Sequence, residues 1–422
     1  MKRLIGIRHR VKKTAAGEAR PTELCVLVDG SITLLSLKLE TETNELDWVM
    51  GRFPVSWRAT TPGDDLSKFS KHHIKWRPLK DDENSETMPK NLLRQEKKVW
   101  MFASKVPSKY EGLKAGDTVV MMLGGSGDAL ASAISRRGET INAKAFRIPP
   151  STVKLARDND DKDNDSALLV KMFKDCPEIF YQVLPRDRKM IWLVNCYRAR
   201  MEAMRQRIKC EQRIFAGAIG RIFASPEGEF PDGTIEECFE DLKANDPILQ
   251  SLIREENGRK AELEKTLEEL PVYTEILQKV EGLGPSISSR IVAAIQDIRR
   301  FPTIAGFKAF CGVHVLPDGR FPRQRHGEVA NWHPDPRQAF FLVADQFNRR
   351  PATEWGQKLL ENKRKLREKH PEVVTNGEGK KKYTDGHIHK MGMWRTSTRF
   401  AEWLYREWKK LEAQTAQKAS AD

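Results

Sequence analysis

The stretch that decides the fold of the first part of the chain is residues 117–151, DTVVMMLGGSGDALASAISRRGETINAKAFRIPPS. An apolar run is followed by a glycine-rich turn, a helix-forming segment, a glycine and a second strand-like run. This is the pattern of a crossover unit in an α/β domain. Upstream, residues 2–13 and 23–40 alternate apolar and polar side chains and are joined by a polar linker, as in a hairpin. Together these segments predict a mixed sheet covered by helices.

The centre of the chain predicts helices. Residues 166–280 are almost wholly helical in pattern, with one long helix at about 188–222 and a second helical stretch at about 234–279. The segment ASPEGEFPDGT between them turns the chain back, so we expect an antiparallel helical hairpin, or coiled coil. The first arm is basic and the second more acidic. This favours a nucleic-acid contact only slightly over an ordinary solvated face.

These patterns predict an α+β multidomain protein. We expect an α/β domain at residues 1–170, a helical hairpin at 171–280, an all-helical domain at 281–411 and a frayed polar tail at 412–422. The basic, aromatic segment 52–108 is expected to be irregular. The aromatic residues of the last helix favour an amphipathic core face over a platform for stacking bases.

Composition narrows the class of protein. The chain has 422 residues, 73 Lys and Arg against 59 Asp and Glu, and a net charge of +14, which suits a polyanionic partner or a merely soluble basic protein. No apolar run is long enough to span a bilayer, and no secretory signal is apparent. The six Cys are far apart, which favours reduced thiols over disulfides or zinc fingers. We therefore expect a soluble, cytoplasmic protein.

Two segments carry the main indications of nucleic-acid binding. In GLGPSISSRIVAAI, residues 282–295, Gly282 and Gly284 frame a turn before a helix whose free amide groups suit a phosphate. The alternative is that the glycines let two helices pack closely. The segment DGRFPRQRHGEVANWHPDPR, residues 318–337, interleaves arginines with aromatic rings, as single-strand and RNA contacts do. A packed loop with solvated arginines is the alternative there.

Metal and nucleotide sites are weakly indicated. His72 and His73 are adjacent, and adjacent histidines on a strand point to opposite faces. His387 and His389 have few further potential metal ligands nearby in the sequence, so we expect both histidine pairs to be structural. Asp158, Asp160, Asp161, Asp163 and Asp165 could hold Mg²⁺, but a solvated loop and helix cap is the safer interpretation. GGSG at 124–127 lacks the Lys and Ser/Thr of a phosphate-binding loop. No metal and no cofactor are expected.

The order of parts resembles a known family. An α/β domain and a helical hairpin, followed by E-G-L-G-P, R-R-F-P-T, F-K-A-F-C-G-V and D-G-R, look like the RNA-guided insertion-sequence transposases. The resemblance is distant, covers about residues 1–408 and is best at 119–170 and 281–345. It implies an N-terminal RNase H/RuvC-like domain, which in that family carries a DEDD tetrad, and a C-terminal part similar to the Nop domain of box C/D RNA-binding proteins.

The family's catalytic residues are largely replaced. Arg8 stands where the first strand of the family carries an Asp, and Gly124 stands at the position of its Glu. Asp165 matches the last acid, while Lys162 occupies the position three residues earlier. Asp318 replaces the nucleophilic Ser. Two-metal catalysis needs carboxylates around both cations, so the resemblance implies a degenerate site that binds no metal.

A closer resemblance is to the Nop-domain Tas proteins, which use guide RNAs from a tandem repeat array, and in particular to their nuclease-free form. It implies a homodimeric ribonucleoprotein from a prokaryote or its virus, with a guide RNA and target DNA as partners. Base pairing would select the DNA, while the protein contacts shape and backbone. The expected nucleic-acid contacts are Arg198, Arg205, Gly282, Gly284, Arg290, Arg299, Arg300, Arg320, Arg323, Arg325, Trp332 and Arg337.

Two alternatives remain open. One is a divergent transposase or nuclease with a shifted metal site at Asp29, Asp161 and Asp165, in which the third acid of the tetrad is Asp161 or Asp163. The position of Asp29 at the end of the second strand counts against it. The other is a ribonucleoprotein scaffold that binds RNA without targeting DNA.

Overall fold

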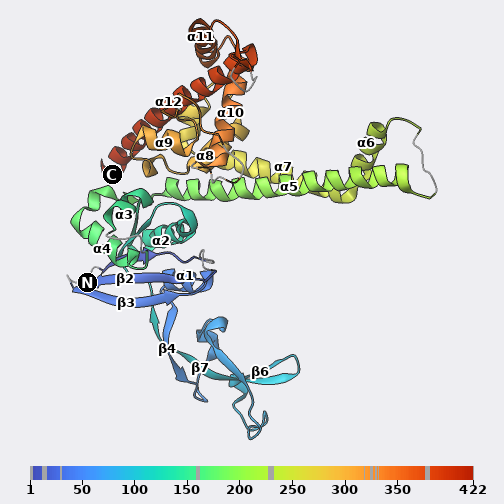
Figure 1. Ribbon diagram of the computed structural model, residues 1–422. Coiled ribbons are helices and arrows are strands. Elements are labelled where there is room, and N and C mark those ends of the chain that lie inside the picture. The colour runs from blue at the N-terminus through green and yellow to red at the C-terminus, as the bar shows by residue number, and fades with distance from the viewer. Residues whose placement is uncertain are drawn as a thin grey trace. The chain divides into compact units, whose positions relative to one another are not determined.

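The computed structural model (Figure 1) describes residues 3–11, 17–28, 31–157, 162–226, 232–317, 319–323, 327, 330, 332–375 and 381–421. The chain forms two compact units, unit 1 at Met1–Pro185 and unit 2 at Arg186–Asp422. It is a mixed α/β protein, as the sequence predicts. None of the helices in the described part of the chain combines the length and apolarity that crossing a membrane requires.

The larger sheet of unit 1 is mixed, with the strand order β10-β9-β8-β1-β2-β3. The central strands β1, β8 and β9 run parallel, whereas β2, β3 and β10 are each antiparallel to their neighbours. The strands are β1 (Arg3–Arg8), β2 (Thr22–Val28), β3 (Ser31–Leu39), β8 (Thr118–Met122), β9 (Lys144–Ile148) and β10 (Tyr181–Gln182). The predicted hairpin and crossover unit are both confirmed.

Helices cover both faces of this sheet because its strands alternate. Ile5 and Met121 pack on one face with α1 (Glu42–Val49) and α2 (Asp128–Ile141). Val120 packs on the other face with α3 (Pro150–Ala156) and α4 (Asp165–Asp175). Gly6 lets α4 approach β1 closely, because a Cβ at Gly6 would lie 2.0 Å from the carbonyl oxygen of Ser166. The expected domain boundary at 170 falls inside α4, and the compact unit extends to 185.

Residues 52–108 are not irregular, contrary to the prediction. They form most of a second, antiparallel sheet in which β7 pairs with β4, β5 and β6. Its elements are β4 (Phe53–Ala59), η1 (Leu66–Lys68), η2 (Lys71–His73), β5 (Lys75–Pro78), η3 (Lys90–Leu92), β6 (Leu93–Glu96) and β7 (Val99–Glu111). Register shifts interrupt the pairing of β4 and β5 with β7. These irregularities obscure the period-two pattern on which strand prediction depends.

Unit 2 opens with the long helix α5 (Pro185–Ala224), as predicted. The second helical stretch is divided: α6 (Ile235–Asn245) ends before Pro247, α7 (Pro247–Glu268) before Pro271, and a π-helical turn, η6 (Val272–Leu277), follows. Ion pairs from Lys189 to Glu269 and from Arg207 to Glu256 show that α5 and α7 are antiparallel. They also show that acids of the second arm neutralise part of the basic first arm.

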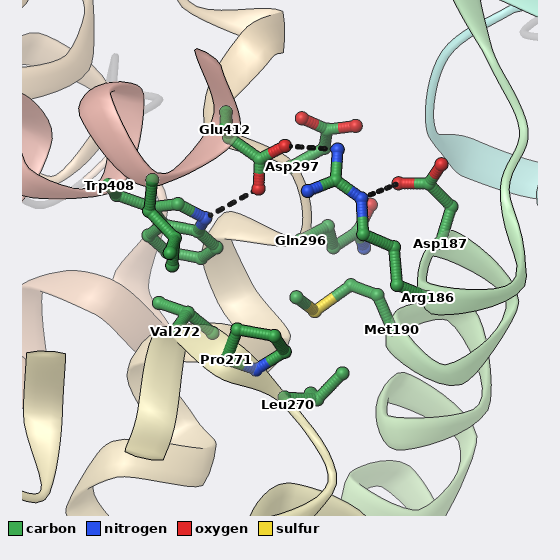
Figure 2. A pocket seen from close by; sticks show the side chains of 11 residues that line it. Arg186, Asp187, Met190, Leu270, Pro271, Val272, Gln296, Asp297, Trp408 and Glu412 are labelled. Atoms are coloured by element: carbon green, nitrogen blue, oxygen red, sulfur yellow. Dashed lines mark hydrogen bonds and ion pairs between the residues drawn. The ribbon is translucent and has the colours of Figure 1, made fainter. Parts of the chain in front are cut away.

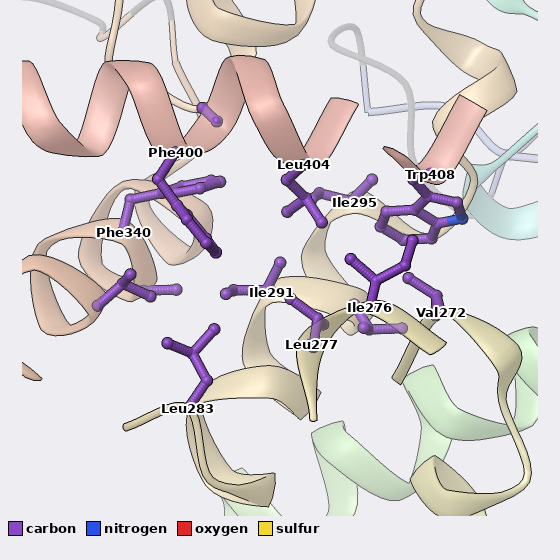
Figure 3. Close-up of a cluster of buried hydrophobic side chains, with 14 of the residues drawn as sticks. Val272, Ile276, Leu277, Leu283, Ile291, Ile295, Phe340, Phe400, Leu404 and Trp408 are labelled. Atoms are coloured by element: carbon purple, nitrogen blue, oxygen red, sulfur yellow. The ribbon is translucent and has the colours of Figure 1, made fainter. Parts of the chain in front are cut away.

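The remaining helices form one core with the base of this hairpin. Residues Leu193 of α5 and Leu267 of α7 share a continuous apolar cluster with Ile291, Phe340 and Phe400, part of which is drawn in Figure 3. The elements are α8 (Pro285–Ile295), η7 (Ile298–Arg300), α9 (Ile304–Phe310), α10 (Pro334–Arg349), α11 (Glu354–Lys369), β11 (Val374–Thr375), β12 (Lys381–Lys382) and α12 (Asp385–Ala421). The hairpin and the C-terminal helices therefore belong to one compact unit.

The last helix supports one expectation and corrects another. Phe400, Leu404 and Trp408 of α12 are buried, so its aromatic face belongs to the core as predicted. The tail after residue 411 is not frayed, because α12 continues to Ala421 and Glu412 forms an ion pair with Arg186. The six Cys are all free, and four of them are buried, in agreement with reduced thiols.

Candidate nucleic-acid interface

Three of the positions that the sequence analysis predicts to be degenerate catalytic positions lie at the edge of the larger sheet where its parallel strands end. Arg8 is the last residue of β1, Gly124 follows β8, and Asp165 begins α4, which packs on β1. We call this the carboxyl edge. In α/β folds such an edge is where ligands bind. The structure therefore places Arg8, Gly124 and Asp165 at one edge of the sheet.

Three acids of the described residues near the carboxyl edge are bound by arginines. Asp165 is 1% exposed and accepts two hydrogen bonds, both of 2.7 Å, from the guanidinium of Arg157. Arg8, itself buried, forms an ion pair of 2.7 Å with Glu23. At the start of α2, Asp128 is bound by Arg147 at 2.8 Å and also accepts the amide of Gly124. Both oxygens of Asp165 are thereby hydrogen-bonded, and the guanidinium of Arg157 supplies the positive charge that a metal ion would otherwise bring.

The residues of the predicted shifted metal site have other partners where the structure describes them. Asp165 is committed to Arg157, which leaves it unsuited to the role. Asp163 is exposed and forms an ion pair with Arg20, and Lys162 is exposed. Asp29, Asp161 and the acids at 158 and 160 lie outside the described residues.

The two glycines that were predicted to contact nucleic acid, Gly282 and Gly284, have different surroundings. Gly282 has a φ of +92° and lies against α10 and its end, where a Cβ would be 3.3 Å from Gln346 and Arg350. This supports the close-packing interpretation at that position. Gly284 is exposed at the start of α8, has open space around it, and offers no side chain to cap the helix. The amides of the first turn of α8 therefore remain available to an anion.

Arg290 of α8 contacts α10 and lies near Tyr197 of α5. Its guanidinium donates to Gln338 at 2.5 Å and lies 3.5 Å from Asp335. Burial raises the pKa of the nearby Tyr197 phenol, while Arg290 and arginines of α5 act in the opposite direction. The Tyr197 hydroxyl is buried and has no hydrogen-bond partner among the described residues. Arg290 is half-buried and held in place, with only part of its guanidinium free to contact a phosphate.

Arg299 is not available as a nucleic-acid contact. Its side chain is 10% exposed and is bound by Asp297 at 2.7 Å and by Asp187 at 2.5 Å. Burial alone would lower the pKa of this guanidinium, but the carboxylates of Asp297 and Asp187 raise it. With Arg186 and Glu412 these residues form a largely buried group that we call the Arg299 cluster. Figure 2 shows its members Arg186, Asp187, Asp297 and Glu412. The role of the cluster is to join the start of α5 to η7 and α12.

Three further expected contacts also have internal partners. The Arg337 guanidinium donates to the carbonyl oxygens of Gly312 and Pro322, and its carbon lies 4.7 Å from the centre of the Trp332 ring. Burial lowers the pKa of Arg337. Trp332 therefore stacks on an arginine of its own chain. Arg300 packs over Phe310, 5.0 Å from the ring centre. These residues shape the loop and α9.

The exposed basic residues are a smaller set. Arg198 and Arg205 project from the outer surface of α5, where Arg198 has no ion pair within the described residues and Arg205 has a contact of 3.5 Å with Glu202. Arg320 and Arg323 are exposed in the loop before α10. Arg325 and Asp318 lie outside the described residues. Gln338 and Tyr197 could not be recognised from the sequence, because they become neighbours of Arg290 only through helix packing.

Comparison with known families matches the core of unit 2. Residues 274–346, from η6 to most of α10, match a family described as "Transposase IS116/IS110/IS902 family". This region of the chain is related to insertion-sequence transposases. The match includes Gly282, Gly284 and Arg290 as well as the basic loop. A search of curated proteins finds no match.

Proposed function

We propose that this protein is an RNA-guided DNA-binding protein that holds a structured guide RNA and has no nuclease activity of its own. The observation that carries the proposal is the pairing of acids with arginines at the carboxyl edge, where Asp165 is bound by Arg157 and Arg8 ends β1. The strand order of unit 1, with a three-stranded antiparallel part joined to parallel strands, suits a degenerate RNase H/RuvC-like domain.

The relation to transposases supports the nucleic-acid part of the proposal. The matched region contains the exposed start of α8 at Gly284 and the basic loop with Arg320 and Arg323. Arg198 and Arg205 add exposed positive charge on α5. A surface of this kind binds phosphates without reading bases, and the sequence of the target is then chosen by base pairing with the guide. In this proposal the protein works as a homodimer with guide RNA and DNA as its partners and needs no cofactor.

The first experiment is to purify the protein together with its neighbouring locus and to sequence the RNA that accompanies it. We expect a discrete, phased small RNA encoded beside the gene. The complex should then bind a DNA that matches the guide and leave it uncut in Mg²⁺. A random mixture of cellular RNA would contradict guide binding, and discrete RNA without DNA binding would indicate a ribonucleoprotein scaffold.

A second function is favoured by the family match itself, which is to transposases. A divergent RNA-guided transposase or recombinase would cleave or join DNA strands in Mg²⁺ and would lose that activity in Asp165→Ala. Because Asp165 is bound to Arg157 through both oxygens, we expect no such activity. Strand joining that depends on Asp165 would overturn the proposal in favour of this alternative.

A further inference from the structure

Three potential metal ligands come together where the two sheets of unit 1 meet. Asp47 lies in α1, and His72 and His73 form the end of η2. The Oδ2 atom of Asp47 lies 2.7 Å from the Nε2 atom of each imidazole, and the three ligand atoms are all within 4.8 Å of one another. Within the described part of the chain this is the one group of three or more His, Cys, Asp or Glu side chains with such an arrangement.

The expectation that adjacent histidines point apart fails here for a structural reason. It assumed a strand, but residues 71–73 form a 3-10 turn. The two rings lie 4.1 Å apart in an edge-on arrangement, and both direct Nε2 at the same carboxylate oxygen. The turn therefore produces the convergence that a strand would prevent.

We propose that Asp47, His72 and His73 form a binding site for a zinc-like divalent cation. Two imidazole nitrogens and one carboxylate oxygen are a ligand set that suits Zn²⁺, whereas Mg²⁺ and Ca²⁺ require more oxygen atoms. In a tetrahedral zinc site with ligand distances of ~2.0–2.1 Å, neighbouring ligand atoms are about 3.3 Å apart. Each observed contact would have to lengthen by well under 1 Å to admit the ion.

The surroundings provide both support and access. The side chains of Asp47 and His73 are 1% and 4% exposed, whereas that of His72 is 46% exposed. The ion can enter past His72, and water can complete its coordination. Arg52 donates to the other carboxylate oxygen of Asp47 at 2.9 Å, which fixes the orientation of that ligand. Its positive charge repels a cation, so binding should be weaker than in a closed structural zinc site.

The buried Nδ1 atom of His73 sets a further condition. It has no hydrogen-bond partner in the described residues. Without metal, Nε2 carries the proton that it donates to Asp47, and Nδ1 can remain unprotonated. With the ion on Nε2, the proton must move to Nδ1. Binding should also weaken in acid, because imidazole must be neutral to ligate a metal.

A bound ion would have a structural consequence. Asp47 belongs to a helix that covers the larger sheet, while one residue, Ile74, separates His73 from β5 of the smaller sheet. In Figure 1, β4 and β7 extend from the region of α1 towards the rest of the smaller sheet. Zinc would therefore fasten the smaller sheet to the larger one and raise the thermal stability of unit 1.

The test is zinc titration of the full chain after removal of any affinity tag and treatment with a chelator. Zn²⁺ affinity is measured by competition with a chromophoric chelator, and Co²⁺ serves as a spectroscopic probe of tetrahedral coordination. We expect one bound ion in the unmodified chain and a loss of affinity of at least about tenfold in His72→Ala. Lys71→Ala, which changes the exposed neighbouring residue, is the matched control and should bind as the unmodified chain does.

Two results would overturn the proposal: no zinc binding beyond that of scattered surface histidines, or binding that His72→Ala leaves unchanged. Asp47, His72 and His73 would then be a hydrogen-bonded clamp only. Circular dichroism checks that each variant is folded. If His72→Ala is not, His72→Gln takes its place, because its amide can still donate to Asp47. The titration contains no nucleic acid, so its outcome is independent of the proposed function.

Discussion

Arginine has opposite surroundings at the carboxyl edge of unit 1 and on helix α5 of unit 2. At the carboxyl edge, Arg157 is 9% exposed and is committed to Asp165 through two hydrogen bonds. On α5, Arg198 is exposed and has no ion pair within the described residues. The first arrangement satisfies an acid that would otherwise be buried alone, and the second leaves a positive charge for a partner.

The difference shows why a count of basic residues is a poor guide to a nucleic-acid surface. Buried acids need positive neighbours, since an isolated buried charge is very costly. Arginines that serve this need, such as Arg299, are unavailable to phosphates. The net charge of +14 therefore matters only where it is exposed, as at Arg198 and Arg323. The predictions below test which arginines belong to which class.

The largest effect should come from the Arg299 cluster. Arg299→Gln leaves Asp187 and Asp297 without their shared guanidinium, so we expect a loss of about 3–5 kcal/mol in the free energy of unfolding. The matched control is Arg198→Gln, which should change that free energy by no more than about 0.5 kcal/mol. Urea denaturation followed by circular dichroism measures both. Equal effects in the two variants would contradict the distinction between paired and exposed arginines.

A second pair of variants tests the carboxyl edge. Arg157→Ala leaves the carboxylate of Asp165, which is 1% exposed, without its positively charged partner. This variant should lower the free energy of unfolding by about 3 kcal/mol. Arg20→Ala breaks an Arg–Asp pair of the same length, 2.7 Å, whose side chains are 40% and 57% exposed. Exposed pairs contribute at most about 1 kcal/mol, so this control should be nearly neutral. A small effect of Arg157→Ala would mean that Asp165 is free to bind a cation.

Measurements of RNA binding test the exposed arginines of α5. Arg198→Glu combined with Arg205→Glu should lower affinity for the co-purified RNA by about tenfold and reduce the salt dependence of binding, because two phosphate contacts are lost. Arg349→Glu is a matched control, since this exposed arginine pairs with Asp345 on α10. Filter binding at several salt concentrations measures both quantities. Unchanged affinity and slope would exclude this surface of α5 from the interface.

Much of the fold could be predicted because it follows local periodicity. The hairpin and crossover unit follow from alternation and from a glycine-rich turn, and α5 follows from a long helical pattern. The second sheet was missed because register shifts, such as those beside Ser56, interrupt its alternation. The extent of α12 was missed because the stability of its end depends on Glu412 meeting Arg186, far away in the sequence.

The candidate site could be predicted less well, since residue type does not reveal a partner. Arg299 and Arg337 have the composition expected of phosphate contacts, yet their guanidinium groups are bound to Asp187 and to backbone carbonyl oxygens. The resemblance pointed to Arg8 and Asp165 as former catalytic positions, but the bond from Arg157 to Asp165 was not predicted. Burial and long-range pairing decide whether each side chain can contact a ligand, and neither can be predicted from a short motif.

The smallest predicted effect concerns the pH dependence of the Arg299 cluster. Burial raises the pKa of Glu412 above its usual 4.5 in the folded protein. Between the unfolded and folded pKa values the native state binds more protons, so this carboxyl makes stability fall as the pH rises through that interval. Glu412→Gln removes the charge but keeps an oxygen for the Trp408 indole, which donates to Glu412 at 3.2 Å.

In the variant, Arg186 and Arg299 are balanced by Asp187 and Asp297, so no net charge is left among these four buried side chains. We therefore expect a change of no more than about 1 kcal/mol in the free energy of unfolding at neutral pH, together with a flatter pH dependence above pH 4.5. Urea midpoints measured across that range, with the exposed Glu354→Gln as control, test this. A large loss of stability in Glu412→Gln at neutral pH would show that both arginines require the third carboxylate. The Arg299 cluster would then tolerate no change of charge at all, in contrast to the surface of α5.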